Sequence, residues 1–138
     1  MDTAACAAYS AFERLNPVTD LYLVDFKGIE EAACREKTGA DLKLVLENIR
    51  KLTDAGKTVE LRIPVIPGYS DTAEYMERAA ALTAALRAES VMLLPFHRLG
   101  APKYRALGLE YEYQTVPGVE RSLLERLSRA FRWQTVKF

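Results

Sequence analysis

The sequence of 138 residues lacks an excess of charge of either sign, because 19 lysines and arginines balance 19 aspartates and glutamates. A balanced charge argues against a generic nucleic-acid-binding protein and against a polybasic protein of the membrane surface. No apolar run approaches the roughly 20 residues that span a bilayer, and the first residues lack the basic-then-apolar layout of a signal peptide. We therefore expect a cytoplasmic protein that binds neither nucleic acid nor membrane.

Residue types that hold metal ions are also scarce. Two cysteines, Cys6 and Cys34, are too few for a disulfide framework or for a four-thiolate zinc site. His97 is the only histidine, and one histidine with scattered carboxylates makes no recognisable zinc site. We interpret both cysteines as small buried apolar side chains and predict that this chain alone holds no metal ion.

Alternating strands and helices are what the sequence does contain. Apolar segments at residues 21–27, 58–66 and 90–95 have the composition of buried parallel strands, and residues 133–138 are predicted to form a short closing strand. Helical spacing of apolar residues predicts helices at residues 4–15, 30–37, 41–55, 71–86 and 119–131, the fourth of them capped by Ser70 or Asp71. Together these elements indicate a single α/β domain over residues 1–138, with a parallel sheet and right-handed crossovers.

Two local features complicate this prediction. Pro64 cannot donate a ladder hydrogen bond, so the second strand is expected to break, bulge or run unpaired after Ile63. Residues 101–117 are rich in proline, glycine and tyrosine and are predicted to form a long ordered loop, with tyrosines that pack together rather than stack on bases. Three helix-connected strands are few for a doubly wound sheet or a barrel, so we expect the chain to be part of something larger.

Charged side chains fall at or near the strand ends. Asp25 and Lys27 lie two residues apart, so both side chains point to the same face near the carboxyl end of their strand. The residues alone leave open a structural ion pair, a binding site, and a barrel lyase that uses Lys27 as a Schiff-base lysine. Arg62 lies within an apolar strand and needs a carboxylate or phosphate partner, because an unpaired buried arginine is strongly destabilising.

Ordered motifs along the chain carry a resemblance to a known family. They are Asp25-Phe26-Lys27, Thr38-Gly39 with Leu46-Glu47-Asn48-Ile49, residues 62–71 (RIPVIPGYSD), and residues 93–100 (LLPFHRLG) followed by Lys103-Tyr104 and Leu107-Gly108. With these motifs the chain resembles the C-terminal half of the activating enzymes of glycyl radical enzymes, such as those of pyruvate formate-lyase. That family belongs to the radical S-adenosylmethionine (SAM) superfamily of oxidoreductases.

The resemblance implies a fold and an activity. In the family, a 4Fe–4S cluster and SAM lie at the mouth of a partial (β/α)6 TIM-like barrel, so this chain is expected to form the C-terminal portion of such a barrel. Cleavage of SAM there produces a 5′-deoxyadenosyl radical, which abstracts hydrogen from a glycine of the partner, a glycyl radical enzyme.

It also implies a set of SAM-site residues. Asp25 and Lys27 match the strand-end D-x-K that contacts SAM, and His97 matches the histidine of the LLP[YF]H segment near SAM. Arg62 matches an arginine on a strand facing the active site. The start of this chain matches an Asp-Thr pair of the family. Together with the Asp25 carboxylate, that pair is implied to form a cation site beside SAM. The implied cofactor-binding residues are therefore Asp2, Thr3, Asp25, Lys27, Arg62 and His97.

The sequence departs from the family in two motifs. The family's cluster requires a CxxxCxxC loop, which the spacing of Cys6 and Cys34 does not match, and the glycine-rich GGEP segment that binds the SAM amino group is absent. The resemblance therefore implies a fragment that lacks the cluster-binding part, with a partial SAM site and no activity by itself. The parent enzyme would hold the 4Fe–4S cluster.

A missing half of the barrel also predicts self-association. An uncovered edge strand would expose backbone hydrogen-bonding groups, and the concave face of the sheet would expose apolar side chains. We expect that face to include Leu21, Leu23, Leu61 or Ile63, and Leu93. The alternative function is a self-contained small α/β binding or interaction module, which predicts a sheet with both edges covered and no half-open mouth.

Overall fold

The computed structural model describes residues 1–132 and 134–138. The strands are β1 (Asp2–Thr3), β2 (Leu21–Asp25), β3 (Thr58–Val65), β4 (Ser90–Pro95) and β5 (Thr135–Lys137). The helices are α1 (Tyr9–Leu15), α2 (Glu31–Thr38), α3 (Leu42–Asp54), α4 (Ala73–Ala85), α5 (Ala101–Ala106) and α6 (Arg121–Ser128), with short 3-10 turns η1 (Asn16–Val18) and η2 (Arg98–Gly100). None of the helices in this described part is long and apolar enough to cross a membrane.

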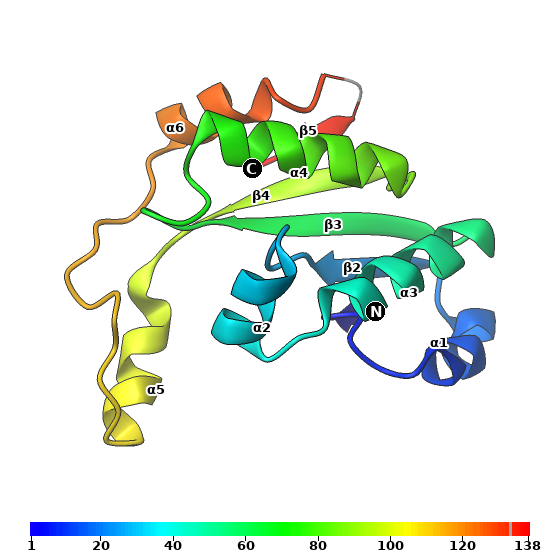
Figure 1. The fold of residues 1–138 in the computed structure, drawn as a ribbon, viewed down its shortest axis with the longest axis horizontal. Helices are drawn as coiled ribbons and strands as arrows, with labels where there is room; N and C mark the ends of the chain where they lie inside the picture. The colour runs from blue at the N-terminus through cyan, green and yellow to red at the C-terminus, as the bar shows by residue number, and fades with distance from the viewer. Residues whose placement is uncertain (133) are drawn as a thin grey trace.

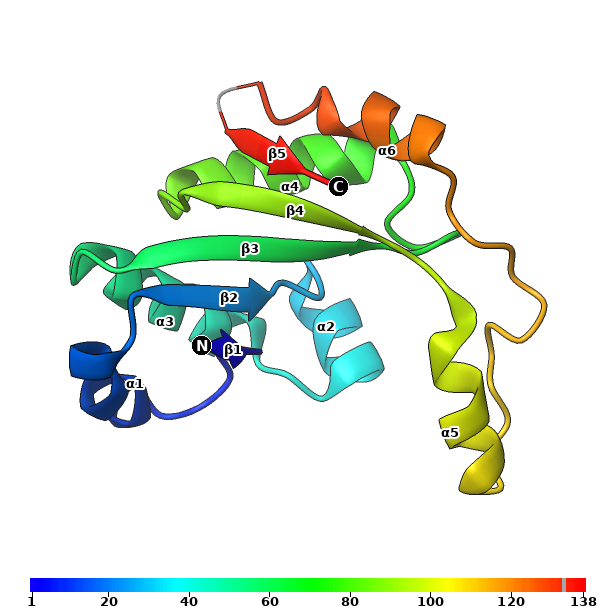
Figure 2. The same cartoon turned by 180° about the vertical axis from the view of Figure 1, so that it is seen from behind.

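The five described strands form one all-parallel sheet in the order of the sequence, β1-β2-β3-β4-β5. Helices α3 and α4 lie on the same side of this sheet, whereas the strands face the viewer when the molecule is turned around (Figures 1 and 2). The carboxyl ends of the strands all point to one edge, beyond which α5 projects away from the sheet. The predicted α/β fold with a parallel sheet is confirmed.

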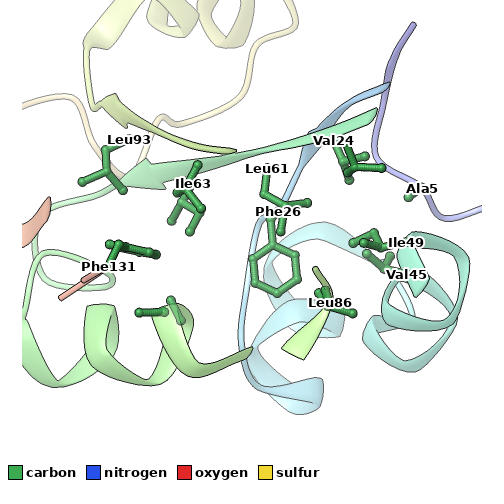
Figure 3. Packing of buried hydrophobic residues seen from close by; sticks show 14 of the residues in the cluster. Ala5, Val24, Phe26, Val45, Ile49, Leu61, Ile63, Leu86, Leu93 and Phe131 are labelled. Atoms are coloured by element: carbon green, nitrogen blue, oxygen red, sulfur yellow. The ribbon is translucent and has the colours of Figure 1, made fainter. Parts of the chain in front are cut away.

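The apolar core lies between the sheet and its helices. Leu61, Ile63 and Leu93 are completely buried there (Figure 3), as are Val59 and Val65 on the same face of β3. Because successive side chains of a strand point to opposite faces, the residues between them face the other way. The expectation that Leu61 or Ile63, and Leu93, would lie on the uncovered face is therefore wrong.

The uncovered face is rich in charged and polar groups instead. Leu23 pairs in register with Glu60, Glu60 with Ser90, and Asp25 with Arg62, so these side chains share that face. Leu21, which is 39% exposed, lies on the same face, as expected. A face that carries several charges does not provide the large apolar patch on which the prediction of self-association depended.

Pro64 remains inside β3, which does not break: it continues to pair with β4 and runs unpaired only on the β2 side, one of the outcomes expected after Ile63. Arg62 O accepts a hydrogen bond from Phe26 N beyond the last residue of β2, whereas Val65 O accepts one from Phe96 N on the β4 side. Backbone groups therefore alternate between the two neighbours, and the nitrogen of Pro64 faces the side on which β2 has already ended. The missing N–H costs no ladder bond at this position.

Several element boundaries also differ from the sequence prediction. Helix α1 begins at Tyr9 rather than residue 4, and Thr72, rather than Ser70 or Asp71, caps α4 by accepting from Tyr75 N at 3.2 Å. The predicted loop at residues 101–117 contains helix α5. In the predicted closing strand, β5 occupies Thr135–Lys137, and Trp133 lies outside the described residues.

Ser70 is buried and holds the turn after β3. Its hydroxyl donates to Pro64 O at 2.6 Å and accepts from Ile66 N at 2.8 Å. We expect Ser70→Ala to lower the free energy of unfolding by about 2 kcal/mol, because two backbone groups lose their partner. Urea unfolding should show this loss, and Ser122→Ala on the exposed surface of α6 should change little. Equal stability of the two variants would contradict this role for Ser70.

Candidate active site

A cluster of four charged side chains lies toward the carboxyl edge of the sheet. Asp25 is the last residue of β2, and Lys27 Nζ lies 3.5 Å from its Oδ2. Arg62 is the neighbour of Asp25 across the β2–β3 ladder, and its Nε donates to Asp25 Oδ1 at 2.8 Å. Arg62 Nη2 also contacts Asp2, so two carboxylates and two cations form one network.

Asp2 and Thr3 reach this site because the first residues of the chain form a strand. Both pair with β2, and Thr3 Oγ1 accepts a hydrogen bond from Ala5 N at 3.0 Å. The following segment is fixed by Asn48, a completely buried residue of α3, whose Nδ2 donates to Ala5 O and Ala7 O at 2.8 Å each. Residues of α3 thus determine where the Asp-Thr pair lies.

Glu60 lies one pleat before Arg62 on the same face of β3. It is 5% exposed, accepts from Ser90 Oγ at 2.8 Å, and pairs with Lys137 of β5. Burial acts to raise the pKa of Glu60, but the hydrogen bonds from Lys137 and Ser90 outweigh it and hold the pKa below its ordinary value. Burial likewise acts to lower the pKa of Arg62, whereas its bonds to Asp2 and Asp25 raise it overall.

Two cavities meet at Asp25 and Lys27. The larger, of about 280 Å³, is lined by these residues together with Lys37, Thr38, Pro64, Ile66, Tyr69, Leu94, Tyr104, Glu112 and Tyr113. The smaller, of about 200 Å³, is lined by the same two residues with Cys6, Cys34 and several residues around α2 and α3. An apolar and aromatic wall around a few charged groups is the usual composition of a small-molecule site.

The tyrosines of the larger cavity were not expected at the site from the sequence. Tyr111 packs against Tyr104 and Tyr113, with ring centroids 4.7 and 6.0 Å apart, which confirms that these tyrosines pack together. Tyr104 and Tyr113 also line the cavity, and an ion pair of 3.5 Å between Lys37 and Glu112 connects their segment to α2. The Lys103-Tyr104 motif was the sequence signal that pointed to this segment.

His97 is not in contact with the charged cluster. It follows β4 by two residues, immediately precedes η2 as its N-cap residue, and is exposed. It is also absent from the described linings of both cavities, whereas Leu94, three residues earlier, lines the larger one. The structure therefore brings Asp2, Asp25, Lys27 and Arg62 into one cluster. His97 lies outside this cluster.

The cysteines do not form a metal centre with other residues. Cys34 is buried and Cys6 is exposed, and both are free thiols. Within residues 1–132 and 134–138, no group of three or more histidine, cysteine, aspartate or glutamate side chains is arranged to hold a metal ion. A 4Fe–4S cluster needs closely spaced thiolates, so the residues present do not fit one.

Comparison with known proteins shows that the chain is similar in sequence to several activating enzymes. It is 34% identical over 134 residues to 4-hydroxyphenylacetate decarboxylase activating enzyme of Clostridioides difficile, covering 95% of this chain and 42% of that protein. It is 36% identical over 117 residues to pyruvate formate-lyase 2-activating enzyme of Escherichia coli, covering 85% and 40%. No family model matches the chain. The chain thus spans less than half the length of these relatives.

A solved structure shares the fold. A domain of pyruvate-formate lyase-activating enzyme from Bacteroides vulgatus superposes with a TM-score of 0.77, covering 98% of this chain and 77% of that one. The two sequences are 17% identical, so this similarity concerns the fold alone.

The lowered pKa of Glu60 predicts how stability depends on pH. Its carboxylate should stabilise the fold above the ordinary glutamate pKa of about 4.3, and this contribution should be lost as the pH falls through the lower folded pKa. Urea unfolding between pH 7 and pH 3 should therefore show a smaller acid loss for Glu60→Gln than for the wild type. Glu89→Gln, at an exposed position, should follow the wild type. Parallel curves for all three proteins would contradict this.

Proposed function

We propose that this chain, a homologue of the activating enzymes of glycyl radical enzymes, is the C-terminal part of a radical SAM activase whose partner is a glycyl radical enzyme. The main support is the identity of 34–36% to such enzymes over most of the chain. A sheet in sequential order with one uncovered face supports the further proposal of a partial (β/α)6 barrel, because sequential parallel strands are the building pattern of such barrels.

The cavity at Asp25 and Lys27 is the proposed SAM site. SAM presents a carboxylate, an ammonium, ribose hydroxyls and an adenine ring. The Lys27 ammonium would bind the carboxylate, and Asp25 would accept from the ammonium or a hydroxyl. Tyr69 and Tyr113, which line the same cavity, offer aromatic surface for the adenine. In an activase, bound SAM supplies the radical chemistry that removes hydrogen from the partner's glycine.

Asp2, Thr3, Arg62 and His97 are proposed to complete the site. Asp2 and Thr3 form β1, which pairs with β2, and Arg62 contacts the carboxylates of both Asp2 and Asp25. His97 lies beyond β4 in an exposed segment from which a bound ligand could be reached. The cluster-binding part would be supplied by a segment other than residues 1–138, since the thiols present do not fit a 4Fe–4S cluster.

The first test is binding of SAM to the purified chain, measured by isothermal titration calorimetry. We expect Lys27→Met and Asp25→Asn each to weaken binding about tenfold, the usual effect of losing a charge-assisted hydrogen bond. Lys43→Met and Asp20→Asn alter exposed residues outside the cavity and should bind like the wild type. Equal effects in all four variants, or no binding by the wild type, would contradict the SAM site.

The second test concerns the cluster. After anaerobic reconstitution with iron and sulfide, the chain should contain far less than one 4Fe–4S cluster per molecule and should not cleave SAM above background, because it lacks the closely spaced thiolates. Iron and sulfide analysis with visible absorption spectra provides the measurement. A stoichiometric cluster would show that this chain has its own cluster site.

A further inference from the structure

We infer that Arg62 is a positioning residue that holds Asp25 in place and does not itself contact the bound ligand. The inference rests on the proposed function, in which Asp25 and Lys27 bind SAM. It departs from the role implied by sequence resemblance, in which this arginine faces the active site as a ligand-contacting group.

The cavities are the first observation. Asp25 and Lys27 line both the 280 Å³ and the 200 Å³ cavity, whereas Arg62 is not among the described residues that line either one. The side chain of Arg62 is 18% exposed, compared with 29% for Asp25 and 45% for Lys27. A ligand in these cavities would therefore meet the carboxylate and the ammonium before the guanidinium.

The hydrogen bonds of Arg62 are the second observation. Its Nε donates to Asp25 Oδ1 at 2.8 Å, and its Nη2 donates to Asp2 Oδ1. Nη2 also lies 2.6 Å from Asp25 Oδ1 as an ion pair, so both nitrogens are engaged by carboxylates of the protein. Because both contacts with Asp25 end on Oδ1, the second oxygen, Oδ2, faces Lys27 Nζ at 3.5 Å.

This arrangement determines the orientation of Asp25. The terminal torsion of an aspartate is broad and is restrained mainly by its contacts. One hydrogen bond and one ion-pair contact from Arg62 on the same oxygen restrain that torsion, so that the other oxygen faces Lys27. Without the guanidinium, Asp2 and Asp25 would repel each other and Asp25 would lose this restraint.

The span of the contact requires an arginine. Arg62 is on β3 and Asp2 is on β1, so the guanidinium bridges two strand spacings of about 4.8 Å each. Its planar fork reaches both carboxylates at once, whereas a lysine ammonium would act as a point charge on one of them. Arg62→Lys should therefore preserve the charge and lose part of the positioning.

The first arm of the test uses no ligand. In the free chain, NMR should show an Arg62 Nε–H protected from solvent exchange by its bond to Asp25. This protection should persist in Lys27→Met and disappear in Asp25→Ala, which has no acceptor for the Nε–H. An unprotected Nε–H in the wild type, or protection that survives Asp25→Ala, would overturn the inference.

The second arm measures SAM affinity in a double-mutant cycle. Arg62→Gln and Asp25→Asn should each weaken binding about tenfold, and the double variant should bind no more than about twofold more weakly than either. Arg62→Lys should recover part of the loss. Effects that multiply to about a hundredfold would show that Arg62 contacts SAM independently, which would overturn the inference.

The two arms separate this inference from the proposed function. If the wild-type chain binds no SAM, the proposed SAM site fails in this chain, and the exchange measurement alone decides whether Arg62 is committed to Asp25. If SAM binds and the cycle is multiplicative, the SAM site stands and the positioning role of Arg62 is rejected.

Discussion

The alternation of side chains along β3 is the constraint on which the site depends. Leu61 and Ile63 must point to the helices to complete the core, and this leaves Glu60 and Arg62 on the uncovered face. Packing of the apolar set therefore holds the charged set in place, because a slip of one residue would exchange the two faces. The apolar core therefore holds the charged cluster in position, although no charged side chain of the cluster belongs to that core.

Charge balance is what allows such a cluster to persist at the carboxyl edge of the sheet. Two cations, Lys27 and Arg62, meet two carboxylates, Asp2 and Asp25, and the buried Glu60 has its own partner in Lys137. A half-buried charge without a partner would be strongly destabilising. The charged side chains of the uncovered face are therefore present as paired groups.

Sequence reasoning predicted the alternating α/β organisation and the bounds of β4, because each rests on a local pattern. It expected Leu61 or Ile63 on the uncovered face, but that face carries Arg62, and the two-residue period of a strand puts both apolar residues on the opposite side. It could not foresee that β2 ends before it reaches the level of Pro64 in the sheet, and the effect of that proline depends on where the neighbouring strand stops.

The cavity wall around Tyr113 could not be predicted from the sequence either, because it forms only when α5 and the following loop fold back toward α2. For the candidate site, sequence position alone brought Asp25 and Lys27 together, whereas the contact of Asp2 with Arg62 requires three strands to assemble.

The sequential order of the strands has a consequence for how the chain folds. Each strand pairs with the one made just before it, so every ladder closes a loop of modest length and no strand must wait for a distant partner. During synthesis, each newly emerged strand and helix could therefore add to an existing sheet edge from the amino end onward. A sheet assembled in this order grows one strand at a time, and the buried Glu60 gains its partner Lys137 only when β5, the last strand, is added.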